Sequence, residues 1–199
     1  EVQVTSVNGA IVDGGEDEGG DINAATAALR AETGIGTDAD PLETVADPGT
    51  TTLIVGATTD SGDIALSNTG ALIVGTVDGL SGAMVEDSAN DNGGADNITL
   101  AASSPLTVTT DVVNNDGGNI TLTATNDGGD DDDLTISANV TATGGNGAID
   151  LNAGDILWTI ANGDGPRDHP AIQHLDLPPL GQPGRASVLI TSSLVFLGE

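Results

Sequence analysis

Lysine and cysteine are both absent from this chain of 199 residues, and its basic side chains are Arg30, Arg167 and Arg185. Set against 31 acidic residues, these three leave a formal net charge of −28. A surface this negative repels nucleic acid and anionic membranes, so we expect neither as a partner. Without cysteine, the chain forms no disulfide and no thiolate metal site. The charge fits a protein that binds divalent cations, stays soluble at high salt or remains dispersed outside a cell.

Aromatic residues are nearly absent, since the chain has Trp158 and Phe196 but no tyrosine. A compact globular core of this size usually contains more large rings, because each buries a large apolar area. A core of branched and small residues suits flat, stacked sheets instead. No run of about 18 apolar residues could span a membrane, and no signal peptide is visible. Because the sequence starts at Glu1, we expect a fragment or a processed chain whose export signals lie elsewhere.

A short phrase recurs along the chain: a Gly, Asp, Asn or Ala residue followed by an apolar–any–apolar triplet. Triplets of this kind begin at Ile64, Ile98, Ile120 and Ile149, and partners of the same shape begin at Leu72, Leu106 and Leu134. Apolar residues at i and i+2 are typical of a strand with one buried face. Repetition of such strands favours a scaffold over a catalyst.

The spacing of these triplets indicates stacked strands joined by loops of variable length. The first two pairs share an offset of eight residues and recur after 34 residues, and the later spacings contract to 22 and 29. Strands this short bury a face only when layers stack upon one another, as in a parallel β-helix. The alternative is an antiparallel β-sandwich, which the scarcity of aromatic residues disfavours.

Three regions follow from this pattern. Residues 1–50 are expected to form strands and loops that include a candidate cap, and residues 51–165 to form the β-solenoid repeats. Within the first region, residues 21–33 fit either a helix or strand fragments. Residues 166–199 hold five of the eight prolines, which lack the N–H that a central strand needs. This last segment is expected to be irregular, either a cap or a tail.

The stretch from about residue 31 to residue 160 resembles filamentous-haemagglutinin-like proteins and related giant repetitive adhesins of bacterial surfaces. The residues that carry the resemblance are Ala31–Thr37 with Asp40–Leu42, Gly62–Leu66 with Gly70–Leu72, and Gly144–Ile156. The resemblance implies a right-handed parallel β-helix, export, and a role in adhesion or surface structure. It offers no catalytic residue to carry over.

The strongest candidate for a metal site in the sequence is the acidic cluster Asp127, Asp130, Asp131, Asp132 and Asp133. Crowded carboxylates repel one another, and a hard cation such as Ca²⁺ relieves that repulsion with oxygen ligands. The alternative interpretation is a solvated charge run on a loop, which is the commoner case. A second acidic run, Asp13 with residues 16–18, lacks the spacing of an EF-hand.

Three other patterns have ordinary structural interpretations. Residues 144–150 nearly match the calcium-binding nonapeptide repeat, but Asp150 comes one position late, which favours a turn followed by a strand. His169 and His174 lack partners for a zinc site or triad and fit surface positions. Glycosylation sequons begin at Asn97, Asn119 and Asn139, as expected by chance where Asn precedes such a strand.

We therefore expect a structural or adhesive β-solenoid segment of a large bacterial surface protein, located outside the cell or at its surface, and not an enzyme. Calcium is the one candidate cofactor, and a calcium-stabilised extracellular module is the first alternative function. A polysaccharide-processing β-helix enzyme is the second, disfavoured because few basic or aromatic residues could hold sugar. Expected partners are a surface glycan or protein, and further copies of the chain stacked end to end into a filament.

Overall fold

The computed structural model describes residues 1–15, 19–86, 94–103, 105–125, 133–145 and 147–153, together with the backbone of residues 155–158. Throughout these residues the structure is all-β, without a helix. The strands are β1 (Val2–Ser6), β2 (Ile22–Ala24), β3 (Thr26–Ala31), β4 (Leu42–Ala46), β5 (Thr52–Thr59), β6 (Ile64–Thr69), β7 (Ala71–Val74), β8 (Thr76–Val77), β9 (Leu80–Ser81), β10 (Ala83–Val85), β11 (Ile98–Ala102), β12 (Leu106–Val108), β13 (Val112–Asn114), β14 (Ile120–Ala124), β15 (Asp133–Ile136), β16 (Val140–Ala142), β17 (Ile149–Asn152) and β18 (Asp155–Trp158).

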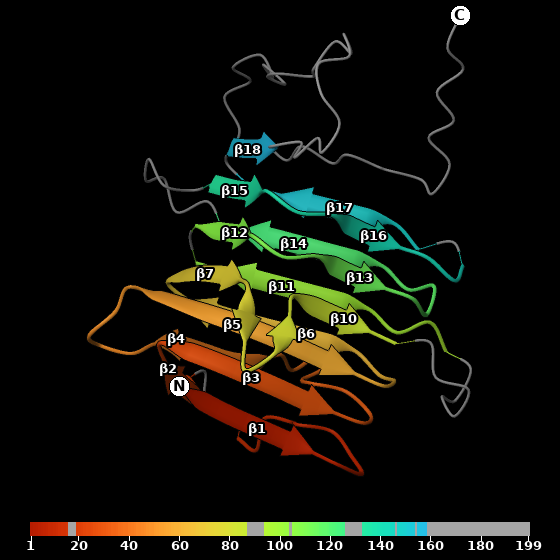
Figure 1. Cartoon of the computed structure of the whole chain (residues 1–199), viewed down its shortest axis with the longest axis horizontal. Coiled ribbons are helices and arrows are strands. Elements are labelled where there is room, and N and C mark those ends of the chain that lie inside the picture. Colours follow the sequence, from red (N-terminus) through yellow and green to blue (C-terminus); the bar gives the residue numbers. More distant parts are fainter. Residues whose placement is uncertain are drawn as a thin grey trace, which may run out of the picture.

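Nearly all of these strands pair in parallel, in two large sheets. The six-stranded sheet has the order β17-β14-β11-β6-β4-β2. The ten-stranded sheet follows β16-β13-β10-β5-β7-β12-β15-β18, with β3 on β5 and β1 on β3. Along the chain, each strand of the six-stranded sheet is followed by one strand of the ten-stranded sheet, or by two strands after β6, β11 and β14, before the chain returns. Paired neighbours in a sheet are therefore separated by many residues of sequence. Figure 1 shows the resulting stack, which runs from β1 at one end to β18 at the other.

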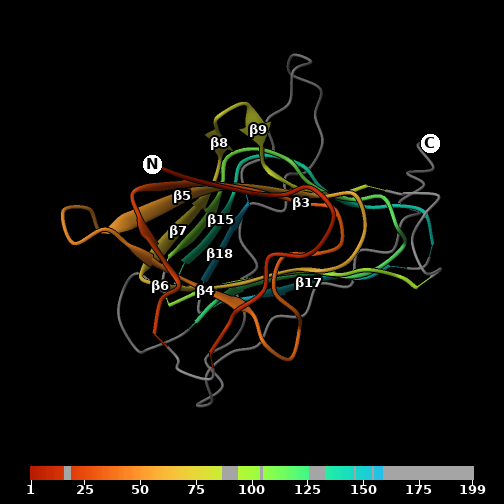
Figure 2. The same ribbon diagram turned by 90° about the horizontal axis from the view of Figure 1, so that it is seen from below.

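Strand β5 explains why the ten-stranded sheet has two arms. Its first half, Thr52–Val55, pairs with β7, and its second half, Ala57–Thr59, pairs with β10. Beyond β5 the arms stay separate, joined by three-residue connectors at 109–111 and 137–139. Between β7 and β10 the connector is longer and contains the antiparallel hairpin β8–β9. Seen along the stack, this hairpin stands outside the sheets (Figure 2).

The recurring triplets lie in register across the six-stranded sheet. Ile64, Ile98, Ile120 and Ile149 pair in succession, and single bridges extend this row to Ile35 and Ile11. A row of leucines runs beside it: Leu42, Leu66, Leu100, Leu122 and Leu151. Across the ten-stranded sheet, Leu53, Leu72, Leu106 and Leu134 form a third row.

These rows form the hydrophobic core. Ile64, Leu100, Ile120 and Leu134 are fully shielded from solvent, as are most of their neighbours in the rows. Full burial of such a side chain contributes about 1.5–3 kcal/mol relative to exposure. The period-2 pattern read from the sequence is confirmed in β11 and β14, where the residue between the apolar pair, Thr99 or Thr121, faces outward and is partly exposed. In β6 the corresponding residue, Ala65, is buried.

Residues 21–33 form strands, so the helix considered for them is wrong. β2 pairs with β4 and β3 pairs with β5, all in parallel. Ala27 and Leu29 are buried opposite Val55 and Ala57. The helix-favouring alanines are here the small residues that fit between two stacked strands, since burial and pairing outweigh a weak intrinsic preference. The N-terminal 50 residues thus supply four strands to the same two sheets.

Two neighbouring turns approach so closely at the entry to the six-stranded sheet that only glycine fits at one position. Gly118 lies before β14, and a Cβ atom there would overlap the carbonyl oxygen of Asp96, before the neighbouring strand β11. The backbone at Gly118 is not in a left-handed conformation, so contact alone excludes a side chain. Gly49, in the loop before β5, has open space around the corresponding position.

We predict that Gly118→Ala lowers the free energy of unfolding by about 1–3 kcal/mol, because the added methyl group forces the two turns apart. Gly49→Ala is the matched control, with an expected change within about 0.5 kcal/mol. Urea unfolding followed by circular dichroism measures both. Equal midpoints for the two variants would show that the stack tolerates a wider turn.

Candidate functional site

The acidic cluster named from the sequence falls mostly outside the described residues. Asp127, Asp130, Asp131 and Asp132 lie there, and the structure tests nothing about them. Asp133 is described: it opens β15, is partly exposed, and lies opposite Asp155 of β18 in the backbone register. It does not belong to the group of close carboxylates that the described residues contain.

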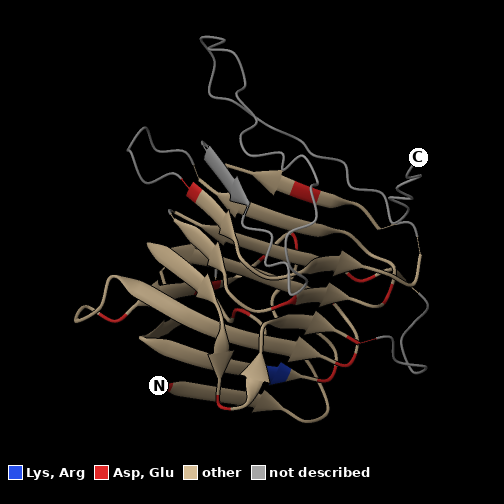
Figure 3. Ribbon diagram, turned by 45° about the horizontal axis from the view of Figure 1, so that its top comes forward, with Lys and Arg blue, Asp and Glu red and all other residues tan. Residues whose placement is uncertain are grey.

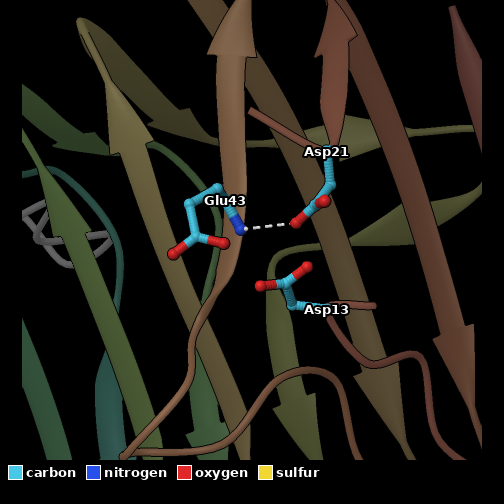
Figure 4. Close-up of side chains that lie close together, drawn as sticks. All are labelled: Asp13, Asp21 and Glu43. Carbon is cyan, nitrogen blue, oxygen red and sulfur yellow. Dashed lines mark hydrogen bonds between the residues drawn. The ribbon is translucent and has the colours of Figure 1, made fainter. Parts of the chain in front are cut away.

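That group consists of Asp13, Asp21 and Glu43, which we call the acidic triad. Each residue offers a carboxylate oxygen, and these oxygens lie within 4.8 Å of one another (Figure 4). Asp13 follows the bridge at Ile11, Asp21 immediately precedes β2, and Glu43 is the second residue of β4. Residues distant in sequence therefore meet at the N-terminal end of the stack.

The parallel pairing of β2 with β4 places two members of the triad. Ile22 lies opposite Thr44, so the preceding residues, Asp21 and Glu43, are also neighbours. The Asp21 N–H donates to the Glu43 carbonyl at 3.0 Å, and the Glu43 N–H donates to Oδ2 of Asp21 at 3.3 Å. Asp21 is exposed, whereas Asp13 and Glu43 are partly buried. The Oε2 atom of Glu43 is shielded from solvent.

Such a triad has the chemistry of a hard-cation site. Calcium takes six to eight oxygen ligands at about 2.3–2.6 Å, from carboxylates, carbonyls and water. Three carboxylates would supply half of this set or less, so water or further protein oxygens would complete it. Sequence analysis singled out Asp13 with residues 16–18 but missed Asp21 and Glu43. The register between β2 and β4 brings Asp21 and Glu43 together, and this register cannot be read from the sequence.

Acidic residues elsewhere in the described part of the chain lie mostly in loops and at strand ends, and Asp150 within β17 is an exception (Figure 3). Arg30 is the one basic side chain among the described residues. It lies in β3, and its Nη2 reaches the carbonyl of Asp78 in the β8–β9 hairpin at 3.5 Å. This cation therefore contacts the hairpin on the outside of the ten-stranded sheet.

A shallow groove of about 480 Å³ lies beside the connectors of the ten-stranded sheet, and its lining includes Met84, Val113 and Asp111. The polar groups in its wall are engaged in holding the fold. Thr109 and Thr110 both donate to the carbonyl of Val74, and Oδ1 of Asp111 accepts from the Asn139 N–H at 3.0 Å. The groove thus shows no pair of carboxylates among the described residues that line it.

The other sequence patterns have structural roles. Residues 147 and 148 precede β17, in which Ile149 is buried and Asp150 is exposed. This confirms that the segment enters a strand, with Asp150 on its outward side. In the sequons, the side chains of Asn97 and Asn119 accept backbone N–H groups of neighbouring turns. Asn139 donates to Asp111 through its side chain. His169 and His174 lie outside the described residues.

No family model, curated protein or solved structure matches this chain. In the described part of the chain, no helix is long and apolar enough to cross a membrane.

Proposed function

We propose that this chain is a segment of a right-handed parallel β-helix and serves as a rigid structural or adhesive element of an extracellular surface protein. The observation that carries the proposal is the in-register stacking of the same triplet in four successive strands of the six-stranded sheet. The regular return of the chain to the six-stranded sheet after one or two strands of the ten-stranded sheet supports a coiled path. Crossovers between parallel strands are right-handed in about 98% of cases, which favours that hand.

The outer faces of the sheets suit display. On the six-stranded sheet, Thr99 and Thr121 form one outward row, and Ser67 and Thr123 belong to the next. Repeated hydroxyls on a stiff support offer many weak contacts at once, and such contacts reinforce one another when a partner spans several of them. The charge of −28 keeps such a chain dispersed. The likeness to giant bacterial adhesins, noted from the sequence, supports the same role.

The stack predicts a fixed distance between its ends. Thr5, Arg30, Thr58, Met84, Val113 and Thr141 pair in succession along one outward row. Five steps of about 4.8 Å place Thr5 and Thr141 about 24 Å apart along the backbone. Because the chain lacks cysteine, spin labels at Thr5→Cys and Thr141→Cys report this distance by pulsed electron resonance.

A second labelled pair, Thr5→Cys with Val113→Cys, is the control. We expect its distance to be shorter by one step, about 5 Å, with a narrow distribution for both pairs. Broad distributions, or a difference unrelated to one strand spacing, would argue against the stacked path.

A mechanical role predicts that the chain unfolds in steps under force. Successive strands of the ten-stranded sheet recur after 34, 28 and 22 residues, from Leu72 to Leu106, Leu134 and Ile156. In a stacked array each unit contacts its neighbours only, so units are released in turn. Pulling on the two ends by force spectroscopy should give length increments of roughly 75–120 Å, at about 3.3–3.6 Å per residue. One single all-or-none event would contradict a solenoid that bears load turn by turn.

A second candidate function is favoured by the acidic triad: a module stabilised by calcium. Asp13 and Asp21, from the loop before β2, lie close to Glu43 of β4 at the end of the stack. A cation bound there would neutralise the mutual repulsion of the triad and fasten that loop to the sheet. Calcium would then stabilise the folded chain and take no part in a catalytic reaction.

Calcium at 10 mM should stabilise the chain by about 1.4 kcal/mol if its Kd is about 1 mM, as in extracellular modules. Thermal unfolding with calcium or with a chelator measures the shift. Asp21→Asn should abolish it, whereas Asp60→Asn, which removes an exposed charge elsewhere, should retain it.

The same experiment separates the two acidic clusters. A shift that survives in Asp21→Asn but disappears in Asp131→Asn would move the site to residues 127–133. No shift in the parent chain at any calcium concentration up to 10 mM would end the calcium hypothesis.

A further inference from the structure

The residue before each recurring triplet forms a hydrogen-bonded ladder along one corner of the stack. Oδ1 of Asp63 accepts the N–H of Asn97 at 2.7 Å, and Oδ1 of Asn97 accepts the N–H of Asn119 at 2.9 Å. Oδ1 of Asn119 then accepts the N–H of Ala148 at 2.8 Å. We call Asp63, Asn97 and Asn119 the corner ladder. Each step ties one strand of the six-stranded sheet to the next.

Asp63 is the one ionisable member of this ladder, although its role requires only an oxygen acceptor. A neutral amide fills the same role at Asn97 and Asn119. Asp63 is partly buried, and its carboxylate accepts a hydrogen bond from the Asn97 N–H. Ionising a partly buried carboxyl costs free energy, since water solvates its charge better than this corner does.

The groups that face Asp63 are themselves acidic. Oδ2 of Asp38, from the loop before β4, accepts the side-chain N–H of Asn97 at 3.2 Å. Oδ2 of Asp96, before β11, accepts the N–H of Gly62 at 2.6 Å. Oδ2 of Asp116, before β14, in turn accepts the N–H of Asp96 at 2.7 Å. The contact of Arg30 is with the hairpin on the other sheet, so it does not offset this charge.

We propose that Asp63 is a proton-binding member of the corner ladder, so that the contact between β6 and β11 is stronger in mildly acidic than in neutral solution. The neutral carboxyl keeps its carbonyl oxygen as an acceptor for the Asn97 N–H. Protonation therefore preserves the ladder while it removes one of three neighbouring negative charges.

The direction of the titration agrees with this geometry. Burial raises the pKa of the Asp63 carboxyl above its ordinary value of 3.8. The hydrogen bond from Asn97 lowers this pKa, and the charges of Asp38 and Asp96 raise it further, so the net shift is upward. The ionised form thus weakens the fold at neutral pH. This penalty disappears as the pH falls through the folded-state pKa, and no further gain occurs below 3.8.

The test compares Asp63→Asn with Asp60→Asn. Asparagine at position 63 keeps the acceptor and removes the charge, so we expect a higher midpoint of urea unfolding than in the parent chain at pH 7. This advantage should shrink as the pH falls toward 4, because the parent chain then protonates Asp63. Asp60 is exposed and three residues away, so Asp60→Asn controls for the lower net charge.

Two outcomes would overturn the proposal. One is an equal change in the unfolding midpoint for both substitutions at every pH, which would mean that only the lower net charge matters. The other is a lower midpoint for Asp63→Asn at pH 7, which would mean that the ionised carboxylate itself holds the corner. Independently of any variant, the carboxyl carbon resonance of Asp63 in the parent chain should titrate above pH 3.8. Titration at or below that value would also overturn the proposal.

Discussion

The rest of the structure depends on one constraint: parallel strands must stack in register so that like side chains lie above one another. A strand of three to five residues has too few contacts to persist alone, and its buried face is covered only by the strands on either side. Isoleucine above isoleucine and leucine above leucine fill this space evenly, because successive strands present the same shape at the same position. Each strand is therefore stable only as part of the stack.

This constraint explains what the sequence could predict. The triplets at Ile64, Ile98, Ile120 and Ile149 were recognisable because apolar periodicity is local, and they pair as their repetition indicated. The strands of residues 22–31 were ambiguous, since alanine is small enough for a helix or for a crowded sheet. Propensity alone does not resolve this, whereas the pairing of Leu29 with Ala57 does.

The acidic triad could not be predicted, for a physical reason. Asp13, Asp21 and Glu43 meet because β2 lies against β4 in one register, and loop lengths of different size produce that register. In a stacked fold, the spacing of the strands in the sequence gives the length of each turn, but it does not identify which residues of neighbouring turns come into contact. In contrast, a cluster of acidic residues that are contiguous in the chain, such as residues 127–133, is visible in the sequence.

Charge is the second constraint, and it acts against the first. Stacking brings equivalent positions of neighbouring turns within about 5 Å, so an acidic residue repeated at an inward corner would repel its own copies. The corner ladder avoids this by using asparagine at positions 97 and 119, while the acidic residues that the structure describes lie mostly in loops and at strand ends. Asp63 departs from that pattern at a corner that Asp38 and Asp96 already make negative. In a stacked fold with so many carboxylates, the stability therefore responds to protons and cations mainly where neighbouring turns bring acidic side chains together. Residues on the outer faces are less constrained, because they do not face copies of themselves at such a corner.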